Sequence, residues 1–189
     1  MIKDLISRNR SYRRFDESFV VSTETLRELV DLGRLSPSGA NRQPLKYILS
    51  NDPENNARIF PALNWAGYLS DWDGPPEGEQ PSAYIILLGD NDISQSTGCD
   101  HGIAAQSILL GAVEKELGGC MIASIQKGKL REALNLSERY DIVLVIALGK
   151  PVETVVIDPI ATDGDIKYWR DEQATHHVPK RSLDEIIIE

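Results

Sequence analysis

Arginine side chains and a serine hydroxyl gather near the amino terminus of a chain that is acidic overall. Residues 10–15 read RSYRRF, and a second basic pair, Lys180-Arg181, lies near the other end. Guanidinium groups and hydroxyls are good phosphate ligands, because charge-assisted hydrogen bonds match the geometry of the phosphate oxygens. An exposed basic surface is the alternative for each cluster. If the two clusters converge in space, they form a single anion-binding site.

A second group of candidate ligands lies in the turn-rich loop of residues 36–44, SPSGANRQP. Its side chains offer hydrogen-bond donors and acceptors that could hold a planar heterocycle carrying carbonyls and ring nitrogens. An ordinary connecting loop is the alternative, because Ser, Gly, Asn and Pro are the usual residues of turns.

The cysteines and histidines indicate neither a metal site nor a nucleophile. Cys99 and Cys120 lie outside any CxxC pattern, so we expect buried free thiols. His101 is expected to cap a helix or lie on the surface rather than donate a proton. His176 and His177 are adjacent and point different ways in an extended chain, and a solvated tail is expected there. We therefore assign no catalytic side chain and no metal ligand.

Composition limits the partners. A chain of 189 residues, 41% of them hydrophobic, can bury one sizeable core, so we expect a single domain over residues 1–189. The balance of 29 acidic against 20 basic residues, a formal charge of -9, argues against nucleic acid and membrane surfaces as partners. The amino-terminal residues contain no long apolar stretch, which favours a soluble cytoplasmic protein.

Helices and strands alternate along the chain and must position these residues. Ser22 is a good N-cap for a helix that ends near residues 36–37, and Asp100 is expected to cap a long helix over residues 101–117. The continuous apolar run 83–88 predicts a strand buried on both faces, at the centre of a sheet. Further strands are expected at residues 46–49, 120–123 and 142–148, with a short helix at 129–134.

Two segments do not fit this alternation. Residues 64–80 are polar and rich in proline, with aromatic side chains near the start, and could form a lid. Residues after Pro151 are extended and charged, yet the chain finishes on the apolar Leu183 and residues 186–188. A tail that ends apolar must dock on another surface, and Trp169 is expected to anchor it on a partner subunit.

These motifs together resemble the nitroreductase-like flavoproteins. Residues 10–15 resemble the opening R-S-x-R-x-F motif of that family, and residues 35–44 its P-S-x-x-N-x-Q-P loop. Asp100, Gln106 and the run 117–122 are similar to its D...Q...LG-x-C-W-I region. Residues 148–151 resemble its L-G-x-P strand end, and residues 179–183 its basic carboxyl-terminal element.

The resemblance implies an α+β fold of the nitroreductase type, with a central, mostly antiparallel sheet flanked by helices, in an intertwined homodimer that holds FMN at its interface. It implies that one subunit holds the phosphate and that the partner's 37–43 loop and the backbone near residues 122–123 lie against the flavin ring. The implied FMN-binding residues are Arg10, Ser11, Arg13, Pro37, Ser38, Asn41, Gln43, Ile122, Ala123, Lys180 and Arg181.

The implied activity is transfer of a hydride from NADH or NADPH, as transient donor, to a small acceptor such as a nitroaromatic or a quinone. The chain lacks a glycine fingerprint after a strand, so it has no Rossmann nucleotide fold of its own. Two alternatives remain: a specialised flavin enzyme that dehalogenates, oxidises a heterocycle or breaks down the flavin, and a flavin-binding protein without turnover.

Overall fold

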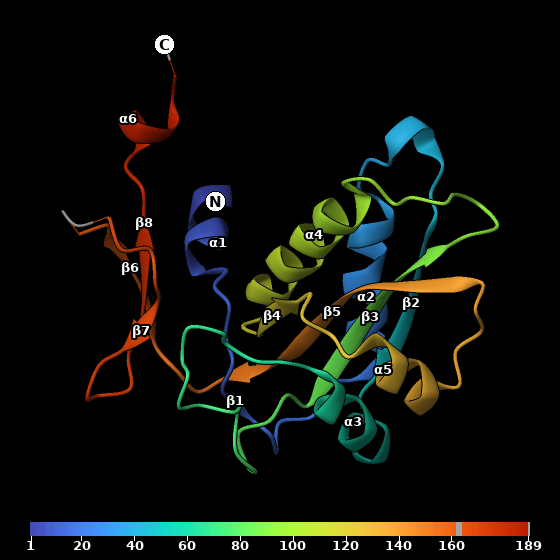
Figure 1. Cartoon of the computed structure of the whole chain (residues 1–189), viewed down its shortest axis with the longest axis horizontal. Helices are drawn as coiled ribbons and strands as arrows, with labels where there is room; N and C mark the ends of the chain where they lie inside the picture. Colours follow the sequence, from blue (N-terminus) through green and yellow to red (C-terminus); the bar gives the residue numbers. More distant parts are fainter. Residues whose placement is uncertain (162–163, 189) are drawn as a thin grey trace.

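The computed structural model describes residues 1–161 and 164–188. The chain forms a body of helices and strands up to Pro151, followed by a carboxyl-terminal arm, residues 152–161 and 164–188 (Figure 1). The helices are α1 (Ile2–Arg8), α2 (Thr23–Arg34), α3 (Pro53–Ile59), α4 (Asp100–Glu114), α5 (Lys127–Leu134) and α6 (Leu183–Ile186), with 3-10 turns at Gly39–Asn41 and Phe60–Ala62. The strands are β1 (Phe15–Asp16), β2 (Leu45–Ser50), β3 (Ala83–Asp90), β4 (Gly118–Ile122), β5 (Tyr140–Pro151), β6 (Val155–Pro159), β7 (Trp169–Arg170) and β8 (His176–Lys180).

The body is built on one antiparallel sheet with the order β1-β5-β3-β2, and β4 also pairs with β5. The apolar run that predicted a central strand is β3, which pairs with β2 on one side and β5 on the other, and all eight of its residues are buried. The expectation of a central antiparallel sheet is thus confirmed. The strands expected at residues 46–49, 120–123 and 142–148 are also found, as β2, β4 and β5.

Helices cover both faces of this sheet (Figure 1). Successive side chains of a strand point to opposite faces, so β3 contributes side chains to two core layers. Its odd-numbered residues pack against α2 and α4, and its even-numbered residues pack against α3 and α5. The first layer includes Leu26, Leu29, Ile85, Leu87 and Ile108, and the second includes Ile59, Tyr84, Ile86, Leu88 and Leu130.

The two helices of the first layer lie in close contact. A Cβ added to Gly111 of α4 would lie 2.3 Å from Cδ1 of Leu32 in α2, so a larger residue there would push the helices apart. Ser22 caps α2 as expected, because its hydroxyl accepts a hydrogen bond from the backbone N–H of Thr25 at 3.0 Å. Asp100, in contrast, does not cap α4, because its carboxylate bonds to a neighbouring loop instead. The cap is Cys99, which is exposed, so the expectation of two buried free thiols is wrong for Cys99 and holds for Cys120.

The arm forms a second, small sheet in which β6 pairs parallel with β8, and β7 pairs antiparallel with β8. It lies beside α1 and carries the chain terminus away from the body (Figure 1). The expected solvated tail at His176 and His177 is therefore wrong: both belong to β8, and His176 is only 1% exposed. Trp169 stacks on His177, with ring centroids 4.1 Å apart. The apolar side chains of α6 and the residues after it are exposed in the single chain.

Candidate flavin-binding site

Two consecutive glycines place the amino-terminal arginine motif beside the sheet. The backbone N–H of Tyr12 donates to the carbonyl oxygen of Gly119 in β4 at 3.0 Å. A Cβ on Gly118 would lie 2.4 Å from Cδ2 of Tyr12, and a Cβ on Gly119 would lie 2.6 Å from the carbonyl oxygen of Ala147. Both positions therefore require glycine, and the motif runs along the end of β4 because of them.

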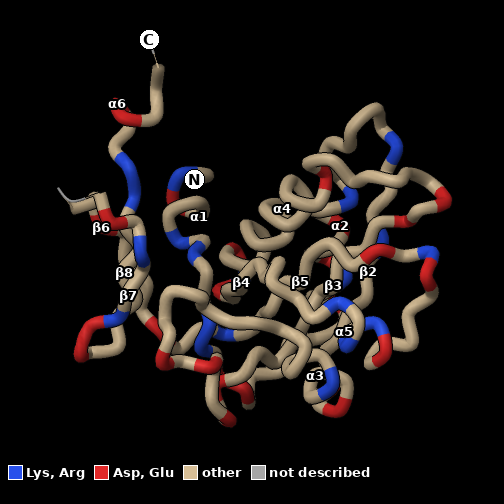
Figure 2. Tube along the Cα trace, in the orientation of Figure 1, with Lys and Arg blue, Asp and Glu red and all other residues tan. Residues whose placement is uncertain are grey.

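The arginine motif and the end of β8 line one cavity of about 340 Å³. Figure 2 shows basic residues on α1 with the segment that follows it, and at the carboxyl end of β8. Asn9 on this segment donates to Gln106 of α4 at 3.3 Å, and both residues line the cavity. The residues that line the cavity are Asn9, Arg10, Ser11, Arg13, Gln106, Leu109, Gly119, Met121, Tyr168, His176, Val178 and Lys180.

Four of the sequence-predicted ligands, Arg10, Ser11, Arg13 and Lys180, are thus brought together by segments about 170 residues apart. The predicted Arg181 is not among the lining residues; its guanidinium is paired with Glu185 of α6.

The end of β4, whose backbone near Ile122 and Ala123 is predicted to lie by the flavin ring, contributes one side chain to the cavity. Met121 lines the cavity, while Ile122 is buried in the core layer under α5. Ala123 is exposed, just beyond the end of β4. Met121 and Ile122 face opposite sides because side chains alternate along a strand, and the role of the backbone at Ile122 and Ala123 stays a prediction.

Arg13 is held inside the cavity by side chains of the arm. Its Nη1 lies 3.2 Å from Nε2 of His176 and donates to the carbonyl oxygen of Ser11 at 3.2 Å. Its guanidinium carbon lies 4.9 Å from the centre of the Tyr168 ring, a cation–π contact. Burial, reinforced by the charges of Arg13, Arg170 and His177, lowers the pKa of His176 to about 4, so this imidazole is neutral at neutral pH.

A buried carboxylate, Glu153, joins the arm to the arginine motif. Its side chain is 0% exposed, and it accepts hydrogen bonds from the backbone N–H groups of Arg13 and, at 3.2 Å, Arg14. Its second oxygen accepts from the guanidinium of Arg170 at 3.0 Å, and that guanidinium lies 4.3 Å from the centre of the Trp72 ring. No sequence pattern indicated this role, because Glu153 is one of many charged residues in a polar segment.

The excursion of residues 64–80 is attached to the same arm. The rings of Tyr68 and Tyr168 lie 4.9 Å apart, and the backbone N–H of Tyr68 donates to the Tyr168 hydroxyl at 3.3 Å. The excursion therefore contacts Tyr168, which also contacts Arg13, and, through Trp72, Arg170, which pairs with Glu153.

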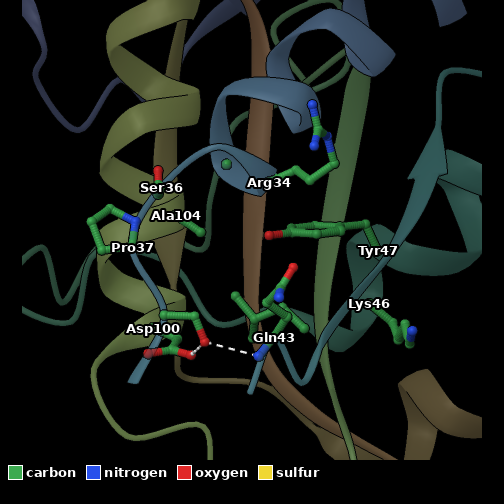
Figure 3. Close-up of a pocket in the computed structure, with 11 residues that line it drawn as sticks. Arg34, Ser36, Pro37, Gln43, Lys46, Tyr47, Asp100 and Ala104 are labelled. Atoms are coloured by element: carbon green, nitrogen blue, oxygen red, sulfur yellow. Dashed lines mark hydrogen bonds between the residues drawn. The ribbon is translucent and has the colours of Figure 1, made fainter. Parts of the chain in front are cut away.

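The loop of residues 37–43 lies at the start of α4, next to a second cavity of about 220 Å³ (Figure 3). Ser38 Oγ donates to one carboxylate oxygen of Asp100 at 2.6 Å, and the backbone N–H of Gly39 donates to the other at 2.9 Å. The predicted ligands Pro37, Ser38 and Gln43 line this cavity, and Asn41 does not. In this chain taken alone, the loop residues and the arginine motif therefore line separate cavities.

This loop holds an unusual backbone conformation. Ala40, Asn41 and Gln43 all have φ values between 50° and 54°, the left-handed region that non-glycine residues rarely adopt. The Gln43 side-chain amide donates to the carbonyl oxygen and to Oδ1 of Asn41, at 3.2 and 3.1 Å. Strain of this kind persists only where neighbouring contacts fix it: the backbone N–H of Gln43 donates to Ser38 Oγ at 2.9 Å, and that hydroxyl donates to Asp100.

Comparison with known proteins decides the family. The profile of the Nitroreductase family matches residues 6–68 and 82–150, which is well over half of the chain. The chain belongs to the Nitroreductase family. The matched segments contain the arginine motif, the 37–43 loop and β4, whereas residues 69–81 of the excursion and the whole arm lie outside them.

Several of the similar proteins and structures are named as nitroreductases. The chain is 24% identical over 180 residues to a Bacillus subtilis (strain 168) protein provisionally named NAD(P)H nitroreductase YodC, covering 79% of this chain and 89% of the relative. The crystal structure of the nitroreductase family protein from Streptococcus pneumoniae TIGR4 matches with a TM-score of 0.74 at 17% identity, over 100% of both chains. An FMN-dependent nitroreductase from Clostridium difficile R20291 matches with a TM-score of 0.65 at 22% identity, over 80% of this chain and 88% of that chain.

The nitroreductase fold and the oxidoreductase class expected from the sequence are confirmed by these matches. Among residues 1–161 and 164–188, no helix combines the length and the apolar character that crossing a bilayer requires. No group of three or more His, Cys, Asp or Glu side chains arranged to hold a metal ion occurs in the same part of the chain.

Proposed function

We propose that this member of the Nitroreductase family is an FMN-dependent oxidoreductase that takes hydride from NADH or NADPH and reduces a small acceptor such as a nitroaromatic or a quinone. The observation that carries the proposal is the convergence of Arg10, Ser11 and Arg13 with Lys180 in one cavity. Three cations and a hydroxyl in an acidic protein form a site suited to a phosphate group.

The donors around the cavity fit the phosphate of FMN. Nε of Arg10 is buried and has no hydrogen-bond partner among the described residues, although its Nη2 donates to the carbonyl oxygen of Ile6 at 2.7 Å. A buried donor without a partner is costly, and an anion would satisfy it. Arg10, Ser11, Arg13 and Lys180 would hold the phosphate, and Arg181 would reach it only by leaving Glu185.

A second copy of the chain would complete the site. The cavity of about 340 Å³ lies at the low end of the range of roughly 300–1,000 Å³ for small-molecule sites, so FMN would extend beyond it. We propose a homodimer in which Pro37, Ser38, Asn41 and Gln43 of the partner contact the flavin, with the backbone near Ile122 and Ala123 on the phosphate-holding chain. The exposed apolar residues of α6 would pack against the partner.

Bound FMN would supply the hydride and electron transfer, and this chain would bind, orient and shield the reacting groups. The preorganised 37–43 loop, fixed by Asp100, would present amide donors without reordering on binding. Residues 1–189 would act as one flavin-binding domain, because Glu153 and His176 tie the arm to the arginine motif. A cytoplasmic location stays a prediction of the sequence.

An absorbance spectrum of the purified protein, recorded under anaerobic conditions before and after NADH or NADPH, tests the proposal. We expect a flavin spectrum that bleaches with one of the two donors and returns when a quinone or a nitroaromatic is added. A bound flavin that stays oxidised with both donors would instead indicate a flavin-binding protein without turnover. A protein that neither contains nor takes up FMN would overturn the proposal.

A further inference from the structure

The guanidinium of Arg13 is fixed by two side chains from the far end of the chain. His176 Nε2 lies 3.2 Å from Nη1, and the Tyr168 ring lies 4.9 Å from the guanidinium carbon. The two rings also contact each other, with centroids 5.2 Å apart. All three side chains line the cavity that we assign to the flavin phosphate.

The protonation state of His176 follows from these contacts. An arginine can only donate, so His176 Nε2 must be the acceptor and the ring proton must be on Nδ1. Nδ1 is buried and has no hydrogen-bond partner within the described parts of the chain. An unpaired buried donor costs stability, which points to a role for this ring other than stabilising the arm.

The direction of a guanidinium matters for anion binding. Its donors form a rigid planar fork, so only some orientations offer two parallel hydrogen bonds to a phosphate. A long side chain that is already held in position also loses less entropy when the anion binds. A ring beneath the guanidinium and an acceptor at one Nη atom fix both its plane and its rotation.

We propose that Tyr168 and His176 are positioning residues that aim Arg13 at the phosphate and so make the site prefer FMN over riboflavin, which lacks the phosphate. The proposal rests on the proposed flavin function. Both residues lie in the arm, outside the segments that match the Nitroreductase family, so this role comes from the chain's own contacts. The arm is then a part of the phosphate site as well as a terminal extension.

Binding constants for FMN and riboflavin, measured by fluorescence titration of the apoprotein, test this role. We expect Tyr168→Leu and His176→Leu each to weaken FMN binding about tenfold, since each removes one contact to a cation, and to change riboflavin binding by less than about twofold. Trp169→Leu and His177→Leu are matched controls, because these neighbours stack on each other and neither lines the cavity. They should leave the FMN-to-riboflavin ratio unchanged.

Conservative variants separate positioning from general loosening of the arm. Tyr168→Phe keeps the ring under Arg13, and His176→Gln can still place an acceptor near Nη1, so both should retain most of the preference for FMN. A parallel loss of FMN and riboflavin binding in the leucine variants, or no loss of either, would overturn the positioning role while leaving the flavin function intact.

A measurement on the unaltered protein covers the case in which a leucine variant does not fold. The ¹⁵N resonance of His176 Nε2 should shift when FMN is added and stay unchanged with riboflavin. Equal shifts with both ligands, or none with either, would contradict the proposal. If the unaltered protein binds neither ligand, the proposed function itself has failed, and this inference fails with it.

Discussion

The hydroxyl of Ser38 donates a 2.6 Å hydrogen bond to the carboxylate of Asp100, which joins the 37–43 loop to the first turn of α4. The same carboxylate accepts from the backbone N–H of Gly39. Two donors from a loop with three left-handed residues thus converge on one acidic side chain that is 8% exposed. These two hydrogen bonds hold the start of the loop against α4.

Asp100→Asn should loosen this loop. An asparagine has only one oxygen acceptor, so either Ser38 or Gly39 loses its partner, and the free energy of unfolding should fall by about 1–3 kcal/mol. Urea unfolding followed by circular dichroism measures the change. Asp31→Asn is the control, since it breaks an exposed pair with Arg34 and should have almost no effect. Equal stability of the two variants would show that Asp100 does not hold the loop.

Two adjacent arginines should have separable roles. Arg13 lines the cavity, whereas Arg14 is paired with Glu79 through two short hydrogen bonds. We expect Arg13→Ala to weaken FMN binding by about 10–100-fold, the loss of one charge-assisted contact, and Arg14→Ala to leave it within about twofold. Equilibrium dialysis with FMN distinguishes them. Equal losses in both variants would mean that the phosphate site has been assigned to the wrong arginine.

Glu153→Gln should detach the arm from the body. The substitution keeps the size of the side chain but removes the negative charge that pairs with Arg170. It also weakens the acceptor of the backbone N–H groups of Arg13 and Arg14. Breaking a buried pair of this kind costs about 3 kcal/mol or more. Hydrogen exchange should show faster exchange in β7 and β8 than in β3. Asp4→Asn, which removes an exposed pair with Arg8, should leave the exchange pattern unchanged, and a similar result for Glu153→Gln would refute the role.

The two histidines of β8 should make the stability of the arm depend on pH in opposite directions. The pKa of His176 is lowered by burial from 6.5 to about 4, so its contribution to stability is present above pH 6.5 and is lost as the pH falls from 6.5 towards 4. Hydrogen bonds to Asp158 and Asp171 raise the pKa of His177, so its contribution is present below pH 6.5 and is lost as the pH rises through the raised value.

Limited proteolysis of the arm across this pH range measures the combined effect of the two histidines on the stability of the arm. Cleavage should increase on the acid side, and His176→Gln should abolish that increase because glutamine does not titrate there. His177→Gln should increase cleavage below about pH 6.5, where the contribution of protonated His177 is present, and should remove the change in cleavage on the alkaline side. Cleavage of the unaltered protein that does not vary between pH 4 and 7 would contradict the lowered pKa of His176.

Removal of residues 183–189 should affect assembly more than cofactor binding. This deletion keeps Lys180 but removes α6, whose apolar side chains are exposed in the single chain. We expect sedimentation equilibrium to show a weaker dimer than for the complete chain, because apolar area would no longer be buried at the interface. A truncated chain that dimerises as well as the original would place the interface elsewhere.

Strong hydrophobic patterns predicted most of the body. The apolar run of β3 and the Ser22 cap of α2 were both found where expected, because burial and capping act locally. The cap assigned to Asp100 was wrong for the opposite reason. Its carboxylate is used by a loop that lies about 60 residues earlier, and nothing near Asp100 in the sequence indicates that partner.

The cavity could be predicted only in part. The basic motifs indicated Arg13 and Lys180, but a solvated tail was expected at His176, whose burial depends on contacts with Arg13 and Tyr168. A buried histidine and an exposed one have the same local sequence signal. The burial of His176 therefore follows from tertiary contacts between the two ends of the chain, which local sequence patterns do not reveal.

A crystal structure of the protein grown with FMN tests the proposed flavin site most directly. We expect the flavin phosphate between Arg10, Ser11, Arg13 and Lys180, with Arg13 still against Tyr168 and His176, and the 37–43 loop of a second copy on the ring. A flavin bound with its phosphate elsewhere, while this cavity holds only water, would contradict it.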